Sequence, residues 1–280
     1  FNLNNSDRRL LIIAGMSGGF ASVFGTPLAG AVFALEVMLT GKLSYKSIAV
    51  SFITAFVAHY TCLAFNVGHT HYTIPVLPPI TFLNLTYAAG AGVIFGFAAR
   101  LFSISVHFWS NLFRSGINYP PLRPVVGGVV IVLAVFLLDT TKYIGLGVPV
   151  IQEAFVNNLN SYDFLLKLVF TTFTLGAGFK GGEVTPLFFV GAALGNALSL
   201  FIPLPLSLMV GIGFVAVFCG AVNTPVACIL MGIELFGIDS FVYVAIACIM
   251  AYFTSGHKGI YTSQIHKGPK AKLKSRLKYF

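Results

Sequence analysis

The segment from Gly176 to Gly191 most constrains how this chain can fold, because it places flexible backbone directly before an apolar helix. Glycines at positions 176, 178, 181 and 182 allow sharp bends and close approach to the main chain. We expect Thr185 to be the N-cap and Pro186 the first helical residue, before a run that stays almost wholly apolar to Ile202. The pattern predicts a helix that begins abruptly after a glycine-rich loop.

A helix start of this kind has two interpretations. Its unpaired N–H groups and the positive end of the helix dipole suit an anion. Inside a bilayer, non-helical backbone survives only where protein buries it or water reaches it. The segment therefore indicates either a pore or transport site, or a glycine hinge in a broken membrane helix with Thr185 as an ordinary cap.

The scarcity of charge excludes an ordinary soluble domain. Apolar residues make up 57% of the 280 residues and charged residues only 9%, against about a quarter charged in soluble domains. The chain is predicted to be an all-α polytopic membrane protein. Its net charge of +9 does not indicate a nucleic-acid partner, because much of it lies beyond the last apolar run, at Lys258, Lys267, Lys270, Lys272, Lys274, Arg276 and Lys278. That placement predicts a cytoplasmic C-terminal tail that contacts anionic lipid head groups.

No metal or cofactor site is expected. The cysteines (Cys62, Cys219, Cys228 and Cys248) are scattered through apolar runs without paired spacing, so they are interpreted as packing residues. The chain begins at Phe1, with a polar stretch that leads into a helix, and we interpret it as a fragment that lacks its N-terminal part.

The apolar runs predict a series of short, interrupted helices, as in transporters built from discontinuous helices. Residues 67–79, with two histidines and three prolines, are expected to form an extracytoplasmic loop. The run 83–113 is too long for an upright span and must tilt or extend beyond the bilayer. The predicted helical runs are 10–39 (broken at 25–27), 48–65, 83–113, 124–138, 150–159, 164–175, 187–202, 206–222, 225–236 and 241–253.

An internal repeat is visible at a constant offset of 198 positions (224 − 26). Thr26-Pro27-Leu-Ala29 with Glu36 matches Thr224-Pro225-Val-Ala227 with Glu234. Lysines follow the first copy and Gly237-Ile-Asp239 follows the second, so the positive-inside rule places the two ends on opposite sides of the membrane. The copies are predicted to be inverted, with residues 1–72 the C-terminal part of the first repeat and 73–280 the second repeat and its basic tail. A site is expected where the broken helices converge.

These residues resemble the CLC family of anion channels and transporters, and the resemblance covers essentially the whole chain. Ala14 to Glu36 is similar to the family's paired short helices, and Asn223 to Glu234 to their counterpart in the second half. Gly182-Glu-Val-Thr-Pro186 takes the place of a filter segment, and Gly259-Ile-Tyr261 that of the segment whose tyrosine hydroxyl binds the central anion.

The resemblance implies anion transport, most specifically fluoride/proton antiport with fluoride export, since the Gly-Glu-Val-Thr-Pro wording resembles the fluoride-transporting branch. Val37 stands where chloride/proton exchangers carry an inner proton-transfer glutamate. Channels and the fluoride branch of the family both lack that glutamate, so its absence alone does not exclude proton coupling. A chloride channel or chloride/proton exchanger is the alternative function. The family's first filter segment and gating glutamate have no match in this chain. The resemblance also implies a homodimer, which we place on the apolar faces beginning at Pro27 and Pro225, and a bacterial inner membrane.

The expected roles follow from the same comparison. The anion would lie against the backbone N–H groups near Gly182, Glu183, Val184 and Thr185, with the Tyr261 hydroxyl opposite, and Lys180 and Pro186 giving support. Glu183 would handle fluoride or protons; the alternative is a carboxylate that stabilises the helix N-terminus. The alternative role of Tyr261 is an interfacial aromatic, and that of Lys180 a snorkelling side chain.

Two further hypotheses concern residues outside that segment. Glu36 and Glu234 are expected to satisfy helix ends, although buried carboxylates in membranes are also functional candidates. Gly15-Met-Ser17-Gly18 superficially matches the nucleophile motif of intramembrane serine proteases, which would need His59 or His107 as the base. Close helix packing is the alternative explanation of that glycine-rich run.

Overall fold

The computed structural model describes residues 4–38, 44–256 and 259–261. Within these ranges the chain is α-helical apart from its loops and a single 3-10 turn at Ile238–Ser240, and it forms no β-strand. The lysine-rich C-terminal run lies outside the described residues. The helices are α1 (Asn5–Phe24), α2 (Pro27–Val37), α3 (Tyr45–Ala64), α4 (Phe82–Gly116), α5 (Leu122–Leu138), α6 (Val148–Ala154), α7 (Asp163–Gly176), α8 (Val184–Leu198), α9 (Leu206–Val222), α10 (Pro225–Phe236) and α11 (Phe241–Thr254).

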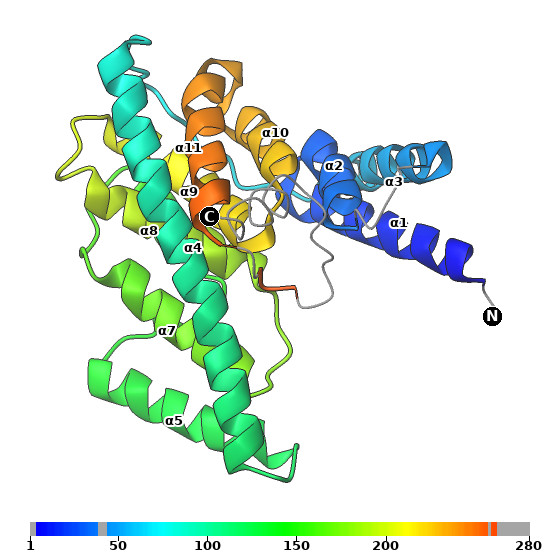
Figure 1. Cartoon of the computed structure of the whole chain (residues 1–280), viewed down its shortest axis with the longest axis vertical. Helices are drawn as coiled ribbons and strands as arrows, with labels where there is room; N and C mark the ends of the chain where they lie inside the picture. Colours follow the sequence, from blue (N-terminus) through cyan, green and yellow to red (C-terminus); the bar gives the residue numbers. More distant parts are fainter. Residues whose placement is uncertain (1–3, 39–43, 257–258, 262–280) are drawn as a thin grey trace, which may run out of the picture.

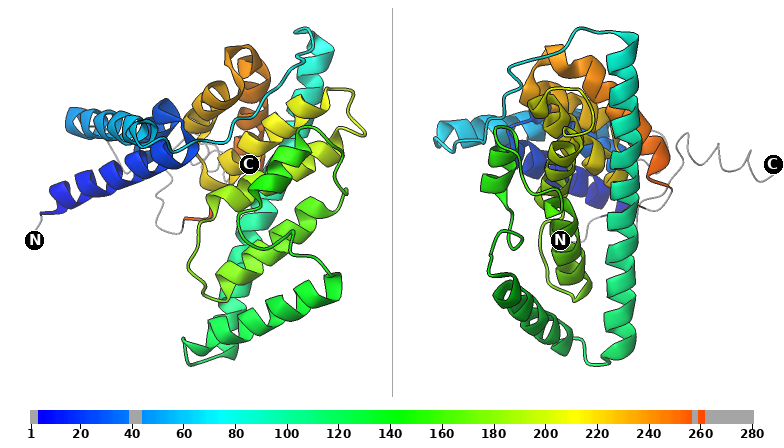
Figure 2. Two further views of the ribbon diagram at one scale, coloured as in Figure 1. Left: turned by 180° about the vertical axis from the view of Figure 1, so that it is seen from behind. Right: turned by 90° about the vertical axis from the view of Figure 1, so that its left-hand side faces the viewer.

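The helices α8 and α9 form the centre of the molecule. Residues 207–222 of α9 are all buried, as expected for a helix that is apolar on every side. It contacts α4, α8, α10 and α11, while α8 also packs on α6 and α7. The long helix α4 runs along one edge of the molecule, and α1 and α3 extend away from α5 (Figures 1 and 2).

Among the residues that the structure describes, two helices, α3 and α4, are long and apolar enough to cross a membrane by length and composition. The other apolar helices, including α5, α8, α9 and α10, are shorter. The predicted run 83–113 is one helix of 35 residues, and the predicted break at 25–27 separates α1 from α2. Short and interrupted helices were therefore predicted correctly.

The crossing of α8 and α9 is unusually close because glycines face one another there. A Cβ atom built on Gly191 would lie 2.2 Å from the Gly213 carbonyl oxygen, and one on Gly213 would lie 2.3 Å from the Gly191 oxygen. A Cβ on Gly195 would lie 2.2 Å from the oxygen of Met209. Small residues let the two backbones touch, as in other membrane helix pairs.

The repeat predicted from the sequence is present in the local structure. Gly25 and Asn223, which end α1 and α9, both adopt the left-handed conformation. Pro27 and Pro225 are each the first residue of the next helix. Equivalent residues of the two copies therefore end one helix and begin the next in the same way.

The glutamates of the repeat cap each other's helices. The Glu36 carboxylate accepts hydrogen bonds from the N–H groups of Val226 (3.2 Å) and Ala227 (2.9 Å). The Glu234 carboxylate accepts from Leu28 (2.9 Å) and Ala29 (2.8 Å). Because each glutamate lies near the end of its own helix and binds the start of the other, α2 and α10 run antiparallel. The expectation that these carboxylates satisfy helix ends is confirmed.

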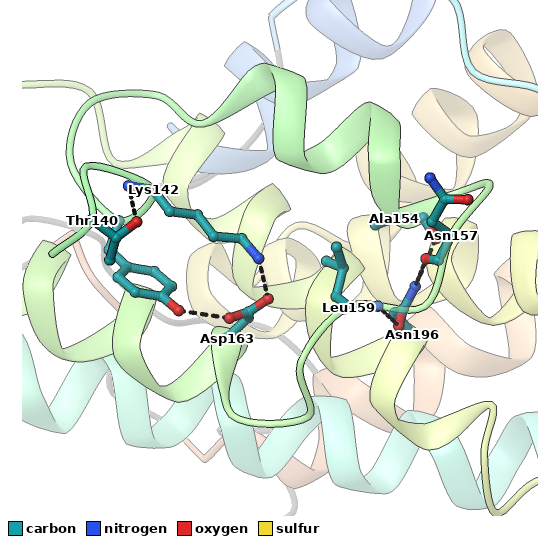
Figure 3. Close-up of polar contacts among 8 residues, drawn as sticks. Thr140, Lys142, Ala154, Asn157, Leu159, Asp163 and Asn196 are labelled. Atoms are coloured by element: carbon teal, nitrogen blue, oxygen red, sulfur yellow. Dashed lines mark hydrogen bonds and ion pairs between the residues drawn. The ribbon is translucent and has the colours of Figure 1, made fainter. Parts of the chain in front are cut away.

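The segment predicted as a helix over 150–159 is shorter than expected. The helix α6 ends at Ala154 because the Asn196 side chain of α8 forms hydrogen bonds with the backbone polar groups at and after that residue. Its amide nitrogen donates to the carbonyls of Ala154 (2.8 Å) and Asn157 (2.7 Å), and its oxygen accepts from the Leu159 N–H at 2.9 Å (Figure 3). A buried side chain thus sets the path of this loop.

Candidate functional site

A cavity of about 900 Å³ lies between α1, α2 and the start of α8. Six of its lining residues belong to α1, and further walls come from the end of α2, the loop before α6 and the last described residues of the chain. The lining residues are Gly15, Met16, Gly19, Phe20, Val23, Phe24, Phe33, Val37, Met38, Leu146, Gly182, Glu183, Val184, Thr185, Ile260 and Tyr261.

The five residues predicted to bind the anion all line this one cavity. Gly182, Glu183, Val184 and Thr185 come from the start of α8, and Tyr261 comes from a segment far along the chain. The Ile260 N–H donates to the Ala221 carbonyl at 3.0 Å, which ties the tyrosine segment to the end of α9. The fold therefore brings a helix start and a phenol to the same space.

The start of α8 lies two residues earlier than predicted, so the assignment of Thr185 as N-cap is wrong. Glu183 is the N-cap residue, Val184 begins the helix, and no side chain caps it. Thr185 and Pro186 follow inside the first turn, where the N–H that proline lacks has no intrahelical partner in any case. The free amides thus belong to the residues around Glu183 and Thr185, as the site requires.

No cationic side chain lines the cavity among the described residues. Glu183 and Tyr261 are its ionisable members, and the α1 and α2 walls are mainly glycine, methionine and aromatic residues. An anion held here would depend on backbone dipoles and hydroxyl groups rather than on an ion pair in direct contact. Sequence reasoning missed this aromatic wall, where Phe20 and Phe33 stack at 4.6 Å; its only signal was the apolar spacing of α1 and α2.

Glu183 also faces a second, smaller cavity. This cavity of about 280 Å³ is lined by Arg114, Arg123 and Lys180 as well. One carboxylate oxygen of Glu183, Oε2, is buried without a hydrogen-bond partner in the part of the chain that the structure describes. A buried carboxylate oxygen without a partner is costly, and in membrane proteins such groups mark functional sites. Its position between two cavities distinguishes Glu183 from the two capping glutamates.

The two residues expected to support the site lie outside the main cavity. Lys180 and Pro186 line a neighbouring space of about 480 Å³ between α5 and α7, which shares Leu146 and Gly182 with the main cavity. The Lys180 side chain is exposed. Any support from these residues is therefore indirect.

The protease hypothesis has no support from the position of Ser17. This residue is fully buried, and its hydroxyl pairs with Thr54 Oγ1 at 2.6 Å and the Ala14 carbonyl at 3.1 Å. His59 stacks on His69 instead, and His107 Nε2 lies 3.4 Å from the Gly259 carbonyl oxygen. The nucleophile motif is explained by packing between α1 and α3, where a Cβ on Gly18 would lie 3.5 Å from Ala58.

Antiparallel broken helices around a helix start that lines a cavity define an integral membrane protein of the channel and transporter class. The family model described as "Voltage gated chloride channel" matches residues 1–256. The chain belongs to this family, which confirms the resemblance stated from its motifs.

Within this family, one curated relative and two solved structures show what the chain is most informatively compared with. A "Chloride/fluoride channel protein" of Pseudomonas syringae pv. tomato is 47% identical over 270 residues, which cover 94% of this chain and 60% of the relative. The crystal structure of a CLC-type fluoride/proton antiporter matches with a TM-score of 0.87 and 35% identity over 91% of this chain and 65% of that one. A slow cyanobacterial Cl⁻/H⁺ antiporter matches in fold, with a TM-score of 0.73 and 20% identity over 98% of this chain and 66% of that one. This chain thus spans about 60% of the curated relative's length.

Proposed function

We propose that the full-length protein carrying this chain exports fluoride across a membrane in exchange for protons. The observation that carries the proposal is the single cavity shared by the start of α8 and Tyr261. The names of the Pseudomonas syringae relative and of the fluoride/proton antiporter structure support fluoride as the transported anion. The Gly182-Glu-Val-Thr-Pro186 wording supports it as well.

The anion would bind to the free N–H groups of the first turn of α8, at Glu183 to Thr185, and to the hydroxyl of Tyr261. Fluoride is strongly hydrated, so the hydroxyl of Thr185, which itself carries one of these amides, would supply a further donor. Neutral donors hold an anion without trapping it, which transport requires. The surrounding apolar wall strengthens each of these contacts by excluding water.

Glu183 would carry the proton in this mechanism. A carboxylate at the anion cavity repels the anion when ionised and can donate a hydrogen bond to it when protonated. Because Glu183 lies between two cavities, it could exchange its proton on one side and meet the anion on the other. Proton and fluoride movements would then be linked at one side chain.

Chloride conduction or chloride/proton exchange is the competing function. Val37 lines the cavity and stands where chloride/proton exchangers carry an inner proton-transfer glutamate. Because channels and the fluoride branch both lack that glutamate, Val37 does not separate a chloride channel from a fluoride/proton antiporter. The experiment is ion efflux from liposomes that contain the full-length protein. We expect fluoride efflux to exceed chloride efflux and to drive protons in the opposite direction. Chloride flux without proton movement would overturn the proposal.

The remaining assignments concern the assembly and its setting. We propose a homodimer in a bacterial inner membrane with a cytoplasmic C-terminus, and the repeat division at residues 72 and 73. Apolar side chains near both expected contact faces are exposed, with Leu28 of α2 at 41% and Val226 of α10 at 55%. Ile53 and Val57 of α3 are exposed as well. Cross-linking between cysteines introduced at Leu28 in two copies tests the contact.

A further inference from the structure

A buried cation lies behind the wall of the anion cavity. Lys167, in the second turn of α7, is 1% exposed. Its Nζ donates to the carbonyl oxygens of Tyr143 at 3.1 Å and Gly145 at 2.6 Å, and lies 5.0 Å from the centre of the Phe189 ring. All of these partners are neutral. Lys167 forms no ion pair with the residues that the structure describes. A buried charge without a counter-ion is expensive, so its presence calls for an explanation.

The nearest acidic group along α7 already has partners. Asp163, one turn before Lys167, is fully buried and accepts a hydrogen bond from the Tyr143 hydroxyl at 2.6 Å. It also forms an ion pair with Lys142 (Figure 3). One carboxylate therefore serves one ammonium group, and the cluster of Lys142, Asp163 and Lys167 carries one net positive charge.

The loop held by Lys167 forms part of the cavity wall. Its bonds to the carbonyls of Tyr143 and Gly145 fix the residues just before Leu146, whose side chain lines the cavity together with Glu183 and Thr185. Gly147 has a φ of +74°, and a Cβ there would lie 2.5 Å from the ring of Phe189 on α8. The loop thus packs between Lys167 and α8, the helix whose start forms the proposed anion site.

We propose that Lys167 is a long-range electrostatic residue for anion binding, whose charge attracts the anion from behind the Leu146 wall without touching it. This inference rests on the proposed anion transport. A charge placed behind a neutral wall raises the anion's affinity but cannot form a tight contact pair with it. It also weakens, without cancelling, the repulsion that an ionised Glu183 exerts on the anion.

A purely structural role for Lys167 gives a different pattern of effects. In that case only its two hydrogen bonds to carbonyl groups matter, and any loss would appear as instability or reduced maximal rate. If the charge matters, a neutral hydrogen-bond donor at position 167 should lower the affinity for the anion, and another cation at that position should preserve it. Lys167→Gln and Lys167→Arg make this comparison in the full-length protein.

The measurement is fluoride efflux from liposomes as a function of fluoride concentration. We expect Lys167→Gln to raise the half-saturating fluoride concentration roughly tenfold, which is the size of effect that a unit charge exerts over about 10 Å when the effective dielectric constant is near 20. Its maximal rate should change much less. Lys167→Arg should stay within about twofold of the unchanged protein, as should the control Arg8→Gln, which removes an exposed cation on α1.

A second variant keeps the test open if Lys167→Gln does not fold. Lys142→Gln removes the net charge of the same cluster and leaves both Lys167 hydrogen bonds in place, so it should also raise the half-saturating concentration. An unchanged concentration in both glutamine variants, or an equal loss in Lys167→Arg and Lys167→Gln, would overturn the inference. If the unchanged protein moves no anion, the proposed function itself fails, which is a separate outcome.

Discussion

Glu36 and Glu234 each cap the helix that carries the other. The threonines that precede these helices make no side-chain cap bond, and the Thr26 hydroxyl is buried without a partner among the described residues. Each carboxylate therefore does for its neighbour what an N-cap side chain usually does locally. This exchange of caps joins the two repeats. Of the three partly buried glutamates that the structure describes, Glu183 is the one that takes no part in it.

Replacing either capping glutamate by alanine should destabilise the protein. Each variant leaves two N–H groups at a helix start unpaired, at a cost of about 1–3 kcal/mol per group. Glutamine, which keeps one acceptor oxygen, should cost less. Thermal unfolding in detergent measures the effect, and Glu153→Ala, at an exposed glutamate of α6, is the control. Equal melting temperatures for Glu234→Ala and the control would contradict the capping role.

The close crossing of α8 and α9 predicts that Gly191→Ala is not tolerated. An added methyl would lie 2.2 Å from the Gly213 carbonyl oxygen, so the helices must separate. We expect a loss of at least about 1–3 kcal/mol, seen as poor yield or a lower melting temperature.

The matched control for that variant is Gly90→Ala in α4. No atom lies within 4 Å of a Cβ at Gly90, and alanine favours a helix over glycine by about 1 kcal/mol. This variant should be neutral or slightly stabilising. If Gly191→Ala behaves in the same way, the two backbones do not touch as described.

Asn196 is expected to be irreplaceable as the anchor of the loop after α6. Asn196→Leu would remove three hydrogen bonds and leave the carbonyls of Ala154 and Asn157 and the N–H of Leu159 without this partner. We predict a loss of roughly 2–5 kcal/mol. Hydrogen exchange at residues 155–160 should rise in the variant before global unfolding. Unchanged exchange there would show that the loop holds its shape without Asn196.

Much of the fold could be predicted because its signals are local. Proline and left-handed residues mark where α2 and α10 begin, and an uninterrupted apolar run marks α9. The partners of the polar groups could not be predicted in this way. Nothing near Glu36 in the sequence indicates that it caps α10. The spacing of Asp163 and Lys167, four positions apart on one helix, suggests an ion pair between them, but in the structure Asp163 pairs with Lys142 instead.

The candidate site was also predictable where its signals are local and unpredictable where it depends on tertiary contacts. The glycine-rich loop and the tyrosine were identified from their sequence motifs, and the fold places them in one cavity. The register of α8 was wrong by two residues because Thr-Pro is also compatible with the inside of a first turn. The aromatic wall from α1 and the charge behind Leu146 depend on tertiary contacts between distant segments, which local patterns do not contain.

Thr185→Val should weaken fluoride transport more than chloride transport. The change keeps the shape of the side chain and removes a hydroxyl donor beside the α8 amides, and the more strongly hydrated ion depends more on each donor. We expect a fall of roughly tenfold in fluoride efflux, the value of one hydrogen bond to a charged group. Thr171→Val, outside the cavity, is the control. Equal losses for both anions would argue against a role in selectivity.

Fluoride binding to Tyr261→Phe shows whether the phenol of Tyr261 and the start of α8 hold one anion between them. Binding is measured by calorimetry on the purified full-length protein, with Tyr162→Phe, an exposed tyrosine before α7, as control. We expect an affinity about ten- to a hundredfold lower for Tyr261→Phe, the loss of a hydrogen bond of about 1.5–3 kcal/mol to an ion, and no change for the control. Unchanged affinity in Tyr261→Phe would contradict the proposed site.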